Sequence, residues 1–223
     1  GLVTGDKNVS IGYLAGTQAD VDPNTGTPTG LTASTYSNAV NIGSDTQALA
    51  NNAIAVGTSS SVAATMVGDI ALGNNAKVTG INATKGGSAS LAIGENALST
   101  GSSEVVIGSN AGKGSTRFTG NPGDVGFASD SALVGQSAGL NSSYIYATYL
   151  GQEAGNGSSG RHNSYVGQNA ARYRDGSLNT ALGSNALVGT SSANKSVGGA
   201  NTALGTSTGA NLVGDFNTLT GYG

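Results

Sequence analysis

The sequence predicts an all-β protein that folds as a parallel β-solenoid, and three observations support this class. Glycine supplies 38 of the 223 residues, more than twice its usual share. Only 9% of the residues are charged, against about 25% in ordinary proteins. A short phrase of the form apolar–small–apolar–Gly recurs along nearly the whole chain. Such repetition is typical of solenoids, in which stacked units bury one another's strands.

The phrase gives the chain its period. A typical copy is Leu91-Ala92-Ile93-Gly94. Successive glycines are 14 or 16 residues apart, except in four longer intervals. These anchor glycines are Gly12, Gly43, Gly57, Gly73, Gly94, Gly108, Gly135, Gly151, Gly167, Gly183 and Gly205, with a degenerate last copy at Gly221. We expect coils of 14–16 residues with two short strands each, in which the anchor glycine supplies a turn with positive φ.

Each phrase alternates in steps of two, which is the period of a strand. The residue before the glycine is Ile, Val or Leu in every copy but the last, so we expect this position to face the interior. The alternate position is most often Ala, with Val106, Leu133, Tyr149 and Tyr165 in four copies. It forms a second semi-apolar stripe. A thin coil buries too little apolar surface to offset the conformational entropy that so many glycines lose on folding. We therefore expect several chains to associate through this stripe.

The longer intervals predict insertions into a single domain that spans residues 1–223. We place them near 17–37, 77–90 and 112–130. Loops carried by a rigid scaffold often hold function. A plain surface excursion is an equally good interpretation of each.

Composition excludes several classes of function. The net charge is −3, without the clustered Lys and Arg that nucleic-acid binding requires. The chain has no Cys, which removes disulfides and thiolate sites and suits an exported protein. No apolar run is long enough to span a bilayer. His162 is the only histidine and lies in a polar stretch between repeats, so we expect a surface loop there rather than a catalytic triad. We predict no enzyme activity, no metal site and no cofactor.

Aromatic and basic residues gather in one part of the chain. Tyr and Arg are favoured at binding hot spots, which makes this cluster a candidate ligand site. Its members are Tyr144, Tyr146, Arg161, His162, Arg172, Tyr173 and Arg174. Tyr173, between two arginines, is the best candidate for an exposed contact. For Tyr149 and Tyr165, at the alternate strand position, we favour packing between protomers.

The phrases Asn38-Ala39-Val40-Asn41-Ile42-Gly43 and Ser90-Leu91-Ala92-Ile93-Gly94 resemble the head repeats of YadA-like trimeric autotransporter adhesins. The resemblance extends from Asn8 to Gly221. It implies a left-handed parallel β-roll, assembled side by side as a homotrimer and displayed on a Gram-negative outer membrane. It also implies attachment to extracellular matrix proteins, other cells or abiotic surfaces. The second half departs from the pattern through a 16-residue unit, as in Asn179 to Ala186.

Two other interpretations share the same solenoid. One is the shaft or receptor-binding segment of a phage tail fibre, where longer units of this kind also occur. The other is a rigid spacer that holds another domain away from the cell. The family's neck and membrane anchor do not occur in this sequence, so the adhesin interpretation depends on the head repeats, and a membrane would be reached only through such an anchor domain.

Overall fold

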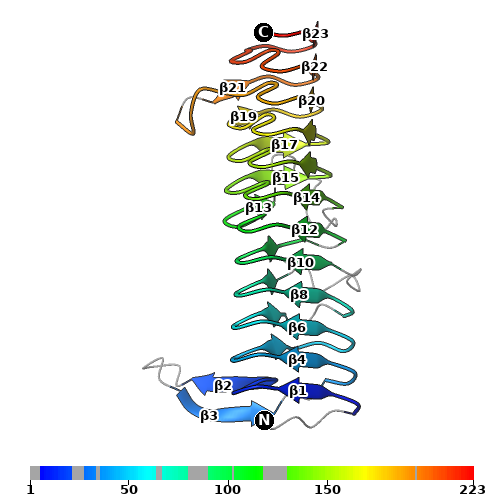
Figure 1. The fold of residues 1–223 in the computed structure, drawn as a ribbon, viewed down its shortest axis with the longest axis vertical. Coiled ribbons are helices and arrows are strands. Elements are labelled where there is room, and N and C mark those ends of the chain that lie inside the picture. Colours follow the sequence, from blue (N-terminus) through cyan, green and yellow to red (C-terminus); the bar gives the residue numbers. More distant parts are fainter. Residues whose placement is uncertain are drawn as a thin grey trace.

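The computed structural model describes residues 6–21, 28–33, 36–63, 67–79, 90–101, 103–117, 130–193 and 195–223. Within these ranges the chain is all-β, and no helix that could cross a membrane occurs there. The strands stack into a long rod with the two termini at opposite ends (Figure 1). We call the stretch from one anchor glycine to the next a coil.

Every copy of the phrase forms one strand of a 12-stranded parallel sheet, the phrase sheet. Equivalent residues pair across all neighbouring strands, as in Leu91 with Val105. The strands are β1 (Val9–Ile11), β4 (Val40–Ile42), β6 (Ile54–Val56), β8 (Ile70–Leu72), β10 (Leu91–Ile93), β12 (Val105–Ile107), β14 (Ala132–Val134), β16 (Thr148–Leu150), β18 (Ser164–Val166), β20 (Thr180–Leu182), β22 (Thr202–Leu204) and β23 (Thr218–Thr220). The predicted repeat register is confirmed.

Between phrase strands the chain visits a second set of parallel strands. In the N-terminal half these are β5 (Gln47–Ala48), β7 (Ser61–Val62), β9 (Lys77–Val78) and β11 (Leu98–Ser99). In the C-terminal half they are β13 (Thr116–Arg117), β15 (Ser143–Ile145), β17 (Ser159–Arg161), β19 (Arg174–Asp175) and β21 (Ser196–Val197). Regular alternation between long parallel sheets is compatible with the predicted β-roll.

The facing of the phrase strands is the reverse of our expectation. The central residue of each strand points inward, and Ala55, Ala92 and Val106 are fully buried. The residue before the glycine points outward: Ile11 is 60% exposed and Leu204 is 48% exposed. In the N-terminal coils the space between the two sheets is narrow and admits Ala rather than Ile or Leu, whereas further along the chain the same inward position holds Leu133, Tyr149 and Tyr165.

The anchor glycines are turn residues, as predicted. All eleven of those named above have φ between +123° and +139°. A Cβ added to Gly94 would lie 2.6 Å from the carbonyl oxygen of Gly108 in the next coil, so the stack excludes a side chain there as well. Asn96, two residues further on, has φ +55°. Asparagine tolerates this left-handed conformation better than most residues.

Two of the three predicted insertions begin later than we predicted. Residues 77–78 and 116–117 are still in the ladder, as β9 and β13, and the excursions that follow them (80–89 and 118–129) lie outside the described residues. The first insertion contains an antiparallel hairpin of β2 (Thr17–Val21) and β3 (Pro28–Ala33), beside the rod in Figure 1. A fourth excursion leaves the stack after Gly189 and returns at Ser196.

One internal column consists of the residues four positions before each anchor glycine. In Asn163, Asn179 and Asn201 the side-chain oxygen accepts the backbone N–H of the same column in the next coil. Their amide nitrogens donate to glycine carbonyls. Asp69 occupies this column in the N-terminal half and accepts the N–H of Ser90 at 2.5 Å. We call this set the polar column, and it ties successive coils together.

Candidate functional site

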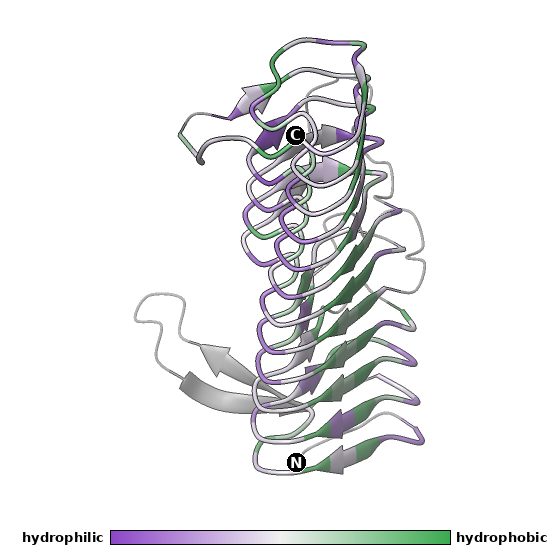
Figure 2. Ribbon diagram, turned by 45° about the horizontal axis from the view of Figure 1, so that its top comes forward, coloured by the Kyte–Doolittle hydropathy of each residue, from purple (hydrophilic) through white to green (hydrophobic). Residues whose placement is uncertain are grey.

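The strands of the phrase sheet are rich in apolar residues, most clearly in the N-terminal half (Figure 2). In β6, β8 and β10 both outward residues of each strand are aliphatic, as in Leu91 and Ile93. From β16 onward the first outward residue becomes Thr or Ser, while Leu or Val remains beside the glycine up to β22. Leu150 and Leu182 are 47% and 46% exposed. This face is the semi-apolar stripe available for association, rather than the buried alternate position.

The predicted tyrosines divide between the interior and the surface. Tyr149 and Tyr165 are fully buried and stack in parallel, with ring centroids 4.9 Å apart. Tyr144 packs edge-on against Tyr149. Burial raises the pKa of Tyr149 to about 12, although a hydrogen bond with Ser158 opposes the shift. Packing of Tyr149 and Tyr165 between protomers is therefore wrong, and so is ligand contact by Tyr144, because these rings fill the inside of their own chain.

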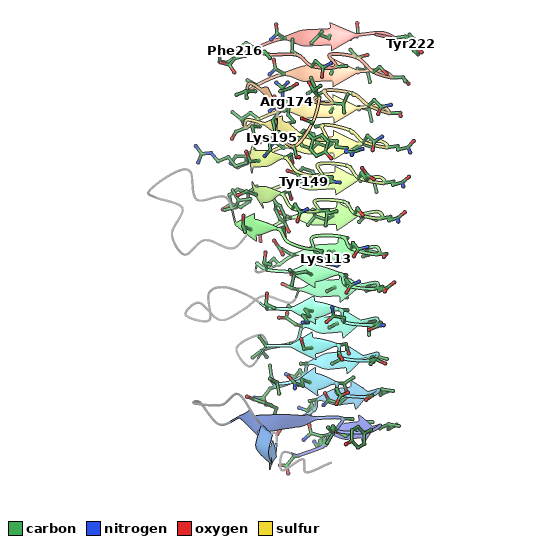
Figure 3. All side chains as sticks on the ribbon, turned by 90° about the vertical axis from the view of Figure 1, so that its left-hand side faces the viewer. Lys113, Tyr149, Arg174, Lys195, Phe216 and Tyr222 are labelled. Carbon is green, nitrogen blue, oxygen red and sulfur yellow. The ribbon has the colours of Figure 1, made fainter. Side chains whose placement is uncertain are left out.

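Arg174 is also an internal residue. Its side chain is fully buried, and its guanidinium donates to the carbonyls of Leu212 at 2.6 Å and Gly198 at 3.0 Å. Burial lowers the pKa of this guanidinium, while Tyr165 and two aspartates act in the opposite direction. The prediction that Arg174 contacts a ligand is therefore wrong: this side chain lies inside the rod and joins the last coils through hydrogen bonds (Figure 3).

A corner ridge remains on the surface of the C-terminal half. It consists of the residues five positions before successive glycines, and all of them have φ between +54° and +62°. Its members are Tyr146, His162, Leu178, Ala200 and Phe216. The rings of Tyr146 and His162 stack at 4.9 Å, and Phe216 is 85% exposed (Figure 3). His162 is exposed and Tyr146 is half-buried, and ligand binding by these two residues stays a prediction.

Arg172 and Tyr173 form a second surface feature. The guanidinium of Arg172 lies 4.6 Å from the Tyr173 ring centroid and donates to its hydroxyl at 2.8 Å. It also pairs with Glu153 at 2.9 Å. Tyr173 has φ +58°, a conformation that costs a bulky residue roughly 1–3 kcal/mol. Gly114, Asn141 and Gly157 occupy the same position in earlier coils, so Tyr173 departs from a column of residues that tolerate this backbone.

A groove of about 290 Å³ lies beside Tyr173. Two backbone hydrogen bonds hold the ends of the fourth excursion beside this groove: the N–H of Gly189 donates to the Arg172 carbonyl, and the N–H of Ser196 donates to the Tyr173 carbonyl. We call this feature the Tyr173 groove; its lining is Leu140, Asn141, Asn156, Gly157, Tyr173, Ser192 and Lys195. Sequence reasoning missed every lining residue except Tyr173. The one feature of the sequence that could have indicated this groove is the interval between Gly183 and Gly205, which is longer than the 14 or 16 residues of a regular coil.

Arg161, the remaining candidate, lies in β17 and is half-buried. Its contact with a ligand stays a prediction. Among the described residues, no three His, Asp or Glu side chains gather as a metal site would require. Comparison of the chain with protein-family models and with curated proteins finds no match.

Proposed function

We propose that this chain is a non-catalytic adhesin head: a left-handed β-roll that assembles side by side as a homotrimer at a Gram-negative cell surface. The observation that carries the proposal is the phrase sheet of twelve in-register strands, whose outer face is aliphatic from β1 to β12 and keeps one aliphatic residue in each strand up to β22. The resemblance of the repeats to YadA-like heads supports the same assembly.

The exposed face gives a physical reason for association. Val9, Ile11, Val105 and Leu150 are each between 39% and 60% exposed, and they lie on one side of one sheet. Contiguous apolar surface of this kind is uncommon on a monomeric protein and marks an interaction site. Covering it with two further copies also adds the burial that the thin interior lacks.

Attachment then follows from multivalency. Three copies of every surface patch raise the effective concentration of the second and third contacts, so weak single contacts sum to firm attachment. We propose matrix proteins, other cells or abiotic surfaces as partners. No nucleic acid, metal or cofactor enters the proposal.

Assembly is tested by sedimentation equilibrium at micromolar concentration. The expected mass is three times the 21.5 kDa chain. Val105→Lys places a charge on the outward face and should shift the chain toward monomer. Val67→Lys is the matched control, because Val67 is 47% exposed but lies outside the phrase strands. A folded parent monomer would contradict the assembly.

Attachment is tested on collagen, fibronectin, laminin and bare plastic. If the repeated roll surface binds, removal of residues 118–129 should leave attachment largely intact, because many equivalent coils remain. Loss of attachment with an unchanged β-rich circular dichroism spectrum would place binding in that excursion instead. A trimer that attaches to none of these surfaces would favour the rigid spacer.

A further inference from the structure

Three polar side chains in the lining of the Tyr173 groove, Asn141, Asn156 and Ser192, make no hydrogen bond to another described residue. Asn156 is only 9% exposed, and its carboxamide makes no hydrogen bond to any described residue. Asn141 and Ser192, which are exposed, add a second carboxamide and a hydroxyl at the mouth of the same groove. Buried polar groups are normally hydrogen-bonded, so an unpartnered carboxamide lining a hollow indicates a place for a polar ligand.

The charges around the groove are already neutralised. Lys195 pairs with Asp175 at 3.0 Å, and Arg172 pairs with Glu153 at 2.9 Å. Asp175 also accepts a hydrogen bond from Ser159. Lys195 is the one charged residue among those that line the groove, and its pairing with Asp175 weakens the attraction for a phosphate, a sulfate or an acidic peptide. The groove therefore fits a neutral ligand.

The chemistry of the free groups narrows the ligand further. Carboxamides and hydroxyls each both donate and accept hydrogen bonds. Sugar hydroxyls do the same. Leu140 and the edge of the Tyr173 ring supply small apolar surfaces at the same hollow, which suit the C–H faces of a pyranose ring. A second hollow of about 200 Å³ is also lined by Tyr173, together with Asn169, Asn185 and Thr190.

Tyr173 shares its positive φ with other bulky residues of this fold, such as Tyr146 and Phe216. What distinguishes Tyr173 is that its ring lines the groove, in a column that holds Gly114, Asn141 and Gly157 in earlier coils. The ring packs over Gly157, where a Cβ would come within 2.7 Å of it. Tyr173 thus lines both hollows.

We propose that the Tyr173 groove binds a neutral oligosaccharide, with one sugar unit beside Asn141, Asn156 and Ser192 and the next across Tyr173. This names a ligand class for the proposed attachment role and rests on that role. Saccharide binding is measured in solution and attachment on surfaces, so failure of one is distinguishable from failure of the other.

The test uses the full chain on an array of oligosaccharides ending in glucose, galactose or N-acetylglucosamine, with sialylated and sulfated counterparts, followed by calorimetric titration of the best neutral binder. Tyr173→Asn should lower the affinity at least tenfold while the melting temperature stays equal or rises, because asparagine tolerates this backbone. Asn156→Ala should also lower the affinity for the saccharide about tenfold, which corresponds to the loss of one good hydrogen bond.

Tyr13→Asn is the matched control, because Tyr13 is 74% exposed and lies far along the chain from the groove. It should bind as the parent does, and parent binding should change little between low and high salt. The proposal is overturned if the parent binds no neutral saccharide, if it binds only the anionic sugars, or if Tyr173→Asn binds as well as the parent. Binding of peptides alone would overturn it too.

Discussion

The buried carboxyl of Asp69 makes the stability of the roll depend on pH. Asp69 is fully buried, and its second carboxyl oxygen has no hydrogen-bond partner within the described chain. Burial raises the pKa of this carboxyl from 3.8 to about 6, although the hydrogen bond from Ser90 opposes the shift. The native chain therefore holds this proton at pH values where the unfolded chain has lost it.

The sign and size follow from linkage. Below pH 3.8 both states are protonated, and Asp69 has no effect on the free energy of unfolding. Between pH 3.8 and 6 the native state loses stability as pH rises, and above pH 6 the loss is complete. A difference of about two pKa units corresponds to roughly 3 kcal/mol as an upper value.

Asp69→Asn should remove this dependence. Asparagine keeps the oxygen that accepts the Ser90 N–H and removes the charge, as in the same column at Asn163 and Asn179. We expect the variant to be more stable than the parent by about 1–3 kcal/mol at pH 7 and nearly equal to it at pH 4.

The assay is urea denaturation at fixed protein concentration from pH 4 to 8, with the exposed Asp6→Asn as control. The reasoning is refuted if Asp69→Asn is the less stable protein at pH 7, or if its advantage is the same at pH 4.

Three further substitutions test the interior by urea denaturation at pH 7. Gly94→Val should lose roughly 3 kcal/mol, because Val is strained at φ +128° and meets the Gly108 carbonyl; equal midpoints would show that the turn accepts a side chain. Asn179→Ala should lower the free energy of unfolding by about 2–4 kcal/mol, because three hydrogen bonds of the polar column disappear. Its control is Gln152→Ala, which removes an exposed hydrogen bond with Gln168 and should change stability by less than about 0.5 kcal/mol. Arg174→Ser should lower the free energy of unfolding by about 2–4 kcal/mol, because it leaves a cavity and two carbonyls without a donor. An unchanged stability would mean that Arg174 does not hold the last coils together.

The aromatic and basic cluster could be located in the sequence, but the direction in which each of its side chains points could not be predicted. Tyr144, Tyr146, Tyr173 and Arg174 lie within about thirty residues, yet two are internal and two are on the surface. The position within the coil separates them. Seven residues after the anchor glycine the chain has Ser115, Ser142 and Ser158, all buried, before Arg174 takes their place.

The sequence by itself determined the strand period, the register of the phrase sheet and the turn glycines, because these are local and repeat with every coil. It could not determine which side of each strand faces inward, because alternation in steps of two fits either side equally. The tertiary structure decided that question through space: the narrow interior takes Ala55 and Ala92 and turns Ile54 and Leu91 outward. It also decided where excursions fold back, since the Tyr173 groove joins residues from three coils and a loop that no local pattern connects.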